Sequence, residues 1–180
     1  MRVRVLVLGG LGVVAAGCFG VKTVPTSAGP VAIRQATSAS TLPPGVLLHG
    51  KLNTTIGMSA SHPGDVVGVT LSENITAGRA TVVPSGAVAY GHVVAVNSGA
   101  DAGVHVAFDS LTFGGQSHVL DANITATDAS GVSVQPVRTE GLGAHTVASA
   151  TRISFAGGAQ LSAGSTLTLV TVTLVRVSTR

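Results

Sequence analysis

The sequence has one cysteine, no tryptophan, one tyrosine and few charged residues. Because Cys18 stands alone, no disulfide can form within the chain. Charged residues make up 9% of the chain, well below the roughly 25% of ordinary soluble domains. Two of the ten basic residues, Arg2 and Arg4, precede an apolar run, so the chain beyond it carries eight basic and seven acidic residues. The basic stripe with interleaved aromatic residues that marks a nucleic-acid-binding surface is missing, and we expect no nucleic-acid partner.

The residues that are abundant favour β-strands. Hydrophobic residues make up 45% of the chain, and they are chiefly Val, Ala, Leu and Ile interleaved with Thr and Ser. β-Branched side chains fit a pleated surface and oppose long helices. The 24 glycines indicate many turns and bulges. The composition therefore predicts an all-β domain.

The first residues are typical of a bacterial export signal. Arg2 and Arg4 form a positive start, and residues 5–16 form an apolar run that is too short to cross the roughly 30 Å hydrocarbon core as a helix. Ala-Ala-Gly and then Cys18 follow, which resembles the lipobox of bacterial lipoproteins. This resemblance implies a signal peptide over residues 1–17 and lipidation of Cys18. The alternative is an ordinary secretory signal followed by a chance cysteine.

Beyond Cys18 the chain divides into a linker and a folded domain. Residues 18–40 are rich in Ser, Thr, Ala, Gly and Pro, and we interpret them as a flexible linker. Residues 41–178 are expected to form the β-domain, with a loop excursion or a short helix within about 128–150. The predicted strands cover residues 46–56, 66–72, 81–83, 87–96, 104–113, 117–127, 151–155 and 166–178.

One turn pattern occurs three times. An apolar residue, two turn residues and a glycine precede a strand at residues 42–45, 83–86 and 161–164. A tight turn that requires glycine gives this spacing. The last long run, residues 167–177, is almost uncharged and must pair, and we predict that it pairs with residues 46–56 to close the sheet. The expected fold is a small barrel or barrel-like sandwich of about seven or eight strands.

The order of these motifs resembles a known family. Leu-Pro-Pro-Gly at 42–45, His-Pro-Gly-Asp at 62–65, Val-Pro-Ser-Gly at 83–86 and the strand after it are similar to the β-barrel domain of the conjugal-transfer TrbI-like family, a scaffold of type IV secretion. A group of small uncharacterised bacterial lipoproteins shares the same layout. The resemblance covers about residues 41–126 and implies a stand-alone version of that barrel, because Cys18 replaces the family's membrane-spanning helix.

Residues capable of catalysis or metal binding are few and scattered. His92 and His105 fall on neighbouring predicted strands as diagonal neighbours on one face, which makes them weak metal candidates. Asp65, Asp109 and Asp121 are each able to orient a histidine, but their spacing selects no triad. The Gly-x-Ser-x-Gly elbow and the phosphate-binding glycine patterns are missing from the sequence. We therefore predict no catalytic residues, no cofactor and no metal site.

The preferred hypothesis is a non-enzymatic structural or protein-interaction module of the bacterial cell envelope. It would be held on a membrane by Cys18 and would bind an envelope protein. Phe19 after the cysteine slightly favours the outer membrane. An envelope protein that binds a small ligand, a peptide or a metal is the alternative, and an unrecognised hydrolase is the last. A filled barrel interior would favour the structural role, and an apolar cavity would favour a ligand.

Overall fold

The computed structural model describes residues 38–138 and 149–179. In these two ranges, no helix has the length and apolar character that crossing a bilayer requires. The fold class predicted from the sequence is confirmed, because almost all regular structure is β. The strands are β1 (Ser38–Leu42), β2 (Leu47–Leu52), β3 (Val66–Leu71), β4 (Ile75–Ala77), β5 (Ala80–Val83), β6 (Val88–Asn97), β7 (Gly103–Phe113), β8 (Gln116–Thr127), β9 (Val132–Arg138), β10 (Ser149–Phe155), β11 (Thr166–Thr171) and β12 (Val175–Thr179), and a 3₁₀ turn, η1 (Gly99–Asp101), links β6 to β7.

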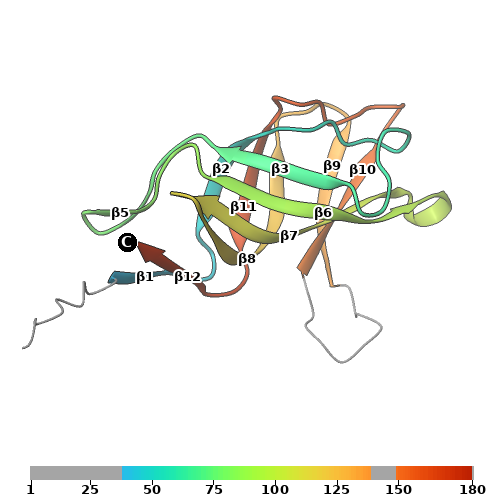
Figure 1. Cartoon of the computed structure of the whole chain (residues 1–180). Helices are drawn as coiled ribbons and strands as arrows, with labels where there is room; N and C mark the ends of the chain where they lie inside the picture. The colour runs from blue at the N-terminus through green and yellow to red at the C-terminus, as the bar shows by residue number, and fades with distance from the viewer. Residues whose placement is uncertain (1–37, 139–148, 180) are drawn as a thin grey trace, which may run out of the picture. The chain divides into compact units, whose positions relative to one another are not determined.

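Six of these strands close into an antiparallel barrel. Their order is β6–β3–β2–β11–β8–β7, and the pairing of β7 with β6 completes the ring. Figure 1 shows β3, β6 and β7 running across the molecule, with β2 and β11 at a steep angle behind them. The predicted pairing between the last run and the first long strand is confirmed, since Leu169 lies opposite Leu48 in the β11–β2 ladder.

The last run is nevertheless two strands rather than the single strand predicted over 166–178. β11 ends at Thr171, and β12 begins at Val175 and pairs with β1. The side chain of Thr171 explains the break. Its hydroxyl accepts the N–H of Val46 at 3.0 Å and donates to the carbonyl of Pro43 at 2.9 Å, so the strand ends against the turn before β2.

The three copies of the predicted turn have one conformation and one role. Gly45, Gly86 and Gly164 have φ values of 87°, 82° and 91°, a region that side chains with a Cβ rarely adopt. Each glycine N–H donates to a strand-end carbonyl of the neighbouring strand, at Thr171, Leu71 and Leu52 respectively. The repeated motif therefore starts a strand and at the same time ties it to its neighbour.

The hairpin of β9 and β10 extends the barrel wall at the point where β8 stops pairing with β7. β8 pairs with β7 only as far as Ala122, opposite Phe108, and β10 then takes over beside β7. The hydroxyl of Thr151 accepts the N–H of Ile124 at 2.8 Å. The expectation of a loop excursion or helix within 128–150 is wrong for β9 and for Ser149 and Ala150, which are in strands. Residues 139–148 lie outside the described residues.

Two small sheets accompany the barrel. β1 pairs with β12 from Ser38 opposite Thr179 to Leu42 opposite Val175, and β4 pairs with β5. β1 begins inside the segment 18–40 that was expected to be linker. Its Ser-Ala-Ser-Thr-Leu sequence has little strand pattern of its own, and pairing with β12 supplies the backbone hydrogen bonds.

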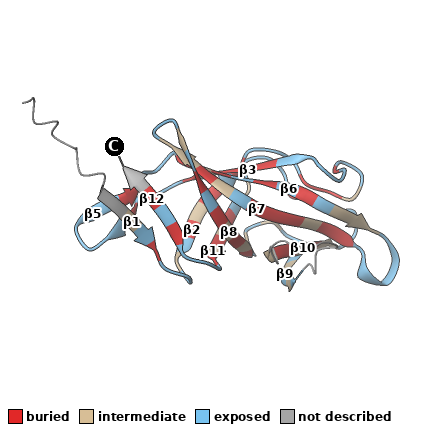
Figure 2. Cartoon of the chain, turned by 60° about the horizontal axis from the view of Figure 1, so that its bottom comes forward, coloured by how far each residue is buried: buried red, intermediate tan, exposed pale blue. Residues whose placement is uncertain are grey.

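Apolar side chains fill the interior of the barrel. Along β2 buried and exposed residues alternate, as expected where one face is inside the barrel. Figure 2 shows the buried positions in red on the ring strands. Every ring strand contributes at least one residue that is 0% exposed, namely Leu48, Val69, Ala89, Leu111, Ile124 and Leu169.

Candidate functional site

A histidine and a carboxylate form a pair on the outer wall of the barrel. His92 lies on β6, and its Nδ1 is 3.0 Å from Oδ2 of Asp109 on β7. The β6–β7 register shifts between Tyr90 and Gly91 while β7 passes from Ser110 to Phe108, so Asp109 is the extra residue of a bulge. Both side chains are about half exposed, at 47% and 57%. The bulge thus presents an oriented imidazole to solvent.

Exposed apolar side chains surround this pair. Val66 on β3 lies directly opposite His92 and is 64% exposed, and Tyr90 and Val94 follow on the same outer face of β6 at 39% and 36%. We call Val66, Tyr90, His92, Val94 and Asp109 the Tyr90 face. Apolar and aromatic groups around a few oriented polar groups are typical of the centre of a protein–protein interface.

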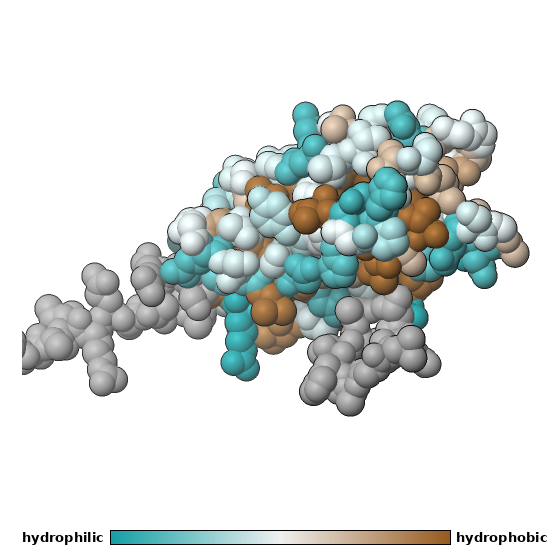
Figure 3. Space-filling model, turned by 45° about the vertical axis from the view of Figure 1, so that its right-hand side comes forward, coloured by the Kyte–Doolittle hydropathy of each residue, from teal (hydrophilic) through white to brown (hydrophobic). Residues whose placement is uncertain are grey.

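A small pocket of about 220 Å³ adjoins the Tyr90 face. Val66 and Asp65 line it together with the segment 54–56. The carboxylate of Asp65 accepts the N–H of His62 at 2.7 Å, so Asp65 caps the turn at Pro63 and Gly64. On the side of the molecule drawn in Figure 3, hydrophobic atoms form separate brown patches among pale and teal residues. A pocket beside an apolar face is suited to receive one side chain of a partner.

The two metal candidates share a face as predicted, but their nitrogens are differently placed. His92 lies opposite Ala107 and His105 opposite Ala95, so the two histidines are diagonal neighbours on the β6–β7 ladder. Nε2 of His105 is buried and has no hydrogen-bond partner, whereas Nδ1 of His92 contacts Asp109. Within residues 38–138 and 149–179, no group of three or more His, Cys, Asp or Glu side chains is arranged to hold a metal ion.

A third histidine of the barrel, His118, lies inside. It is only 8% exposed and stacks on Phe113 with ring centroids 4.7 Å apart. Its position opposite Leu111 on the inward side of β8 explains the burial. The third candidate carboxylate, Asp121, contacts the hydroxyl of Ser149 at 3.5 Å. Of the three aspartates, Asp109 is therefore the one that orients a predicted candidate histidine.

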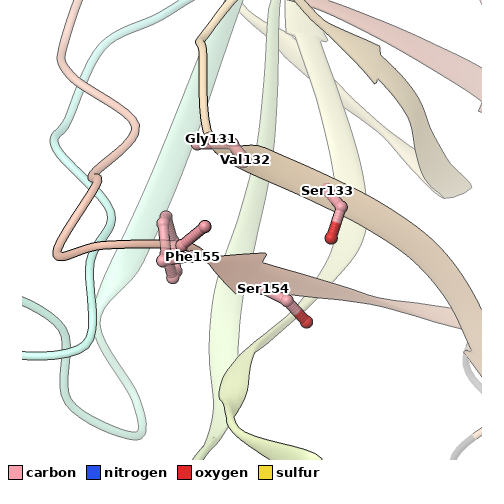
Figure 4. A pocket seen from close by; sticks show the side chains of 6 residues that line it. Gly131, Val132, Ser133, Ser154 and Phe155 are labelled. Atoms are coloured by element: carbon pink, nitrogen blue, oxygen red, sulfur yellow. The ribbon is translucent and has the colours of Figure 1, made fainter.

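A second pocket, of about 380 Å³, lies at the base of the β9–β10 hairpin. Figure 4 shows Ser133 and Ser154 on the two adjacent strands, with the Phe155 ring at the pocket wall. The two serines are register partners. The pocket lining consists of Gly, Val, Ser, Phe and Ala, so it contains hydroxyl groups but no acid or base to activate them.

Sequence reasoning found His92, and the alternation along residues 88–96 already placed Tyr90, His92 and Val94 on one face. It missed the partnership with Val66 and Asp109, because the β3–β6 register and the bulge are long-range features. The lipidation residue, Cys18, lies outside the described residues.

Comparison with known proteins gives a likeness of fold. No protein-family model matches the chain, and no curated protein matches its sequence. Among solved structures, ComB10 of the Com type IV secretion system of Helicobacter pylori is similar, with 13% identity and a TM-score of 0.48 over 76% of this chain and 89% of that chain.

Proposed function

We propose that this protein is a non-enzymatic lipoprotein of the bacterial cell envelope, and that its barrel binds an envelope protein through the Tyr90 face. The observation that carries the proposal is the contrast between the inside and the outside of the barrel. Inside, apolar side chains fill the space that a ligand would need. Outside, Val66 and Tyr90 are exposed beside an oriented imidazole.

The geometry of the face favours a protein partner over a small molecule. It is spread over β3, β6 and β7, three strands that neighbouring ladders hold side by side, so its residues are positioned before binding. The adjoining pocket of about 220 Å³ is small for a ligand site, since such sites usually measure about 300–1,000 Å³. Tyr90 offers a large contact area at low entropy cost, as tyrosines at interfaces do.

Site-specific cross-linking tests the face. A photoreactive phenylalanine analogue replaces Tyr90 in one variant and Thr166 in the other. Thr166 is the control because it is exposed and lies on β11, which pairs with β2 and β8 and with no strand of the face. We expect a discrete cross-linked protein from the analogue at 90 in whole envelopes, its loss when Val66→Asp is added, and no such product at 166. Equal products from both positions, or indifference to Val66→Asp, would contradict the proposal.

The anchor is tested by the mass of the mature N-terminus. Cleavage before Cys18 and two or three acyl chains on that residue are the expected result. A chain that retains residues 1–17 and a free thiol would show that the membrane anchor is not a lipid on Cys18.

A further inference from the structure

Two turns that are far apart in the sequence form one apolar surface at an end of the β1–β12 ribbon. The turn before β2 and the turn after β11 are joined because Gly45 donates to the carbonyl of Thr171 at 2.8 Å, and Thr171 donates its N–H to the carbonyl of Val46 at 3.0 Å. We call residues 43–47 and 172–174 the paired turns. In Figure 1 both lie at the bottom of the molecule, beside the ribbon.

The paired turns expose hydrophobic side chains. Leu47 and Leu174 are 51% and 52% exposed, Val172 is 37% exposed, and Pro43 and Pro44 are exposed as well. The stretches 41–48 and 164–175 contain no Asp, Glu, Lys or Arg. Several exposed apolar side chains on two hydrogen-bonded turns indicate a contact that removes them from water.

Most residues of the paired turns present no free backbone donor. Pro43 and Pro44 have no N–H, and the N–H groups of Gly45, Val46 and Val172 donate to Thr171 or to Asp121. A lipid surface offers few partners to backbone donors, so a surface that exposes few of them is suited to it. This scarcity of free donors favours lipid as the occupant.

The route of the chain brings this surface close to a membrane. Leu42, just before the paired turns, lies opposite Val175, and the other end of the ribbon is Ser38, which is twenty residues after Cys18. Twenty residues extend to about 70 Å at most. A domain anchored through Cys18 therefore stays within that distance of the membrane, where even a weak apolar contact gains from the high effective concentration.

We propose that the paired turns are a second, non-covalent contact with the lipid surface on which Cys18 anchors the protein. The inference rests on the anchor in the proposed function. The apolar side chains enter the interfacial region, and Arg176, exposed on β12 beside the surface, reaches lipid phosphate groups. The Tyr90 face, on β3, β6 and β7, stays available to a protein partner.

The chain has no tryptophan, so a single introduced tryptophan is a specific reporter. The mature, lipidated protein carries Leu174→Trp in one sample and Val66→Trp as the control, because Val66 is also exposed but belongs to the Tyr90 face. Both are reconstituted in phosphatidylcholine vesicles with and without brominated acyl chains. We expect a blue shift and at least a twofold quenching by brominated lipid at position 174, and neither change at position 66.

The outcomes separate the two proposals. Protein that floats with the vesicles while both tryptophans stay unquenched overturns the lipid contact and leaves the anchor intact. Equal quenching at both positions also overturns it, because the contact would not be confined to the paired turns. Protein that fails to float overturns the anchor, and the lipid contact with it. Adding Leu47→Ser to the Leu174→Trp protein should reduce the quenching without releasing the protein.

Discussion

At the scale of single residues, the buried hydroxyl of Thr171 makes two hydrogen bonds that hold the end of β11 against the turn before β2. It is 2% exposed and satisfies the N–H of Val46 and the carbonyl of Pro43. Thr171→Val keeps the shape but leaves these two groups without partners, and we expect a loss of about 1–3 kcal/mol in the free energy of unfolding. Urea titration followed by circular dichroism measures it. Thr173→Val is the control, because Thr173 is exposed and should change stability by no more than about 0.5 kcal/mol.

Gly91 is required for a different reason, the close approach of two strands. A Cβ at this position would lie 2.1 Å from the carbonyl oxygen of Ala107, which is backbone and cannot rotate away. Gly91→Ala should therefore cost about 3 kcal/mol or more. Gly45→Ala is the comparison, since its Cβ meets no atom within 4 Å and only its φ is strained, at about 1–2 kcal/mol. Unfolding curves that rank Gly45→Ala as the more damaging change would contradict the strand contact seen at Gly91.

His92 and its diagonal neighbour His105 predict how the protein responds to a metal. Nδ1 of His92 is engaged with Asp109, and Nε2 of His105 is buried. We expect that Zn²⁺ at a few equivalents leaves the melting temperature of the purified protein unchanged, because a ligand stabilises only by binding the folded state better than the unfolded one. A clear rise in melting temperature that His92→Ala abolishes would instead establish a metal site.

At the scale of elements, the side chain of Thr151 helps to join the hairpin of β9 and β10 to β8. The hydroxyl of Thr151 accepts the N–H of Ile124 where β8 no longer has β7 as a neighbour. Thr151→Val should speed hydrogen exchange at the Ile124 amide, whereas Thr151→Ser keeps the acceptor and should preserve protection. Unchanged exchange in Thr151→Val would mean that another group satisfies this amide.

The turns were the elements that the sequence predicted best, because their chemistry is local. Gly114 and Gly115 form the two-residue loop between Phe113 and Gln116, and a Gly-Gly pair between two apolar runs is a local signal for such a hairpin. The elements that sequence reasoning missed depend on distant residues. β9 contains Pro136, which interrupts its pattern and is tolerated because β9 is bonded in a ladder to β10 alone among the described strands.

The difference between local features and features that depend on distant residues also applies to the candidate site and to β1. Period-two alternation was enough to place Tyr90 and His92 on one outward face. The Asp109 bulge and the opposition of Val66 to His92 required the register of strands that the sequence does not specify locally. β1, with its polar sequence, forms only because β12 is next to it.

At the scale of the whole molecule, the described domain should not need the lipid in order to fold. Its ring is closed by pairings within residues 47–171, all of them remote from Cys18 in sequence. Cys18→Ala should therefore leave the melting temperature of the domain unchanged and move the protein from the washed membrane fraction to the soluble fraction. Membrane retention after washing, with the fold intact, would place the anchor elsewhere.

The pairing of β1 with β12 has a mechanical consequence. Any pull on the chain ahead of Ser38 is applied first to a ribbon of two five-residue strands and reaches the six-stranded ring after that. The ribbon will separate before the ring is strained, and the release of β1, the strand between Ser38 and the ring, adds about 16 Å of extension. A load between the membrane and a bound partner is thus absorbed by reversible unzipping at the edge of the domain, while the surface that holds the partner keeps its shape.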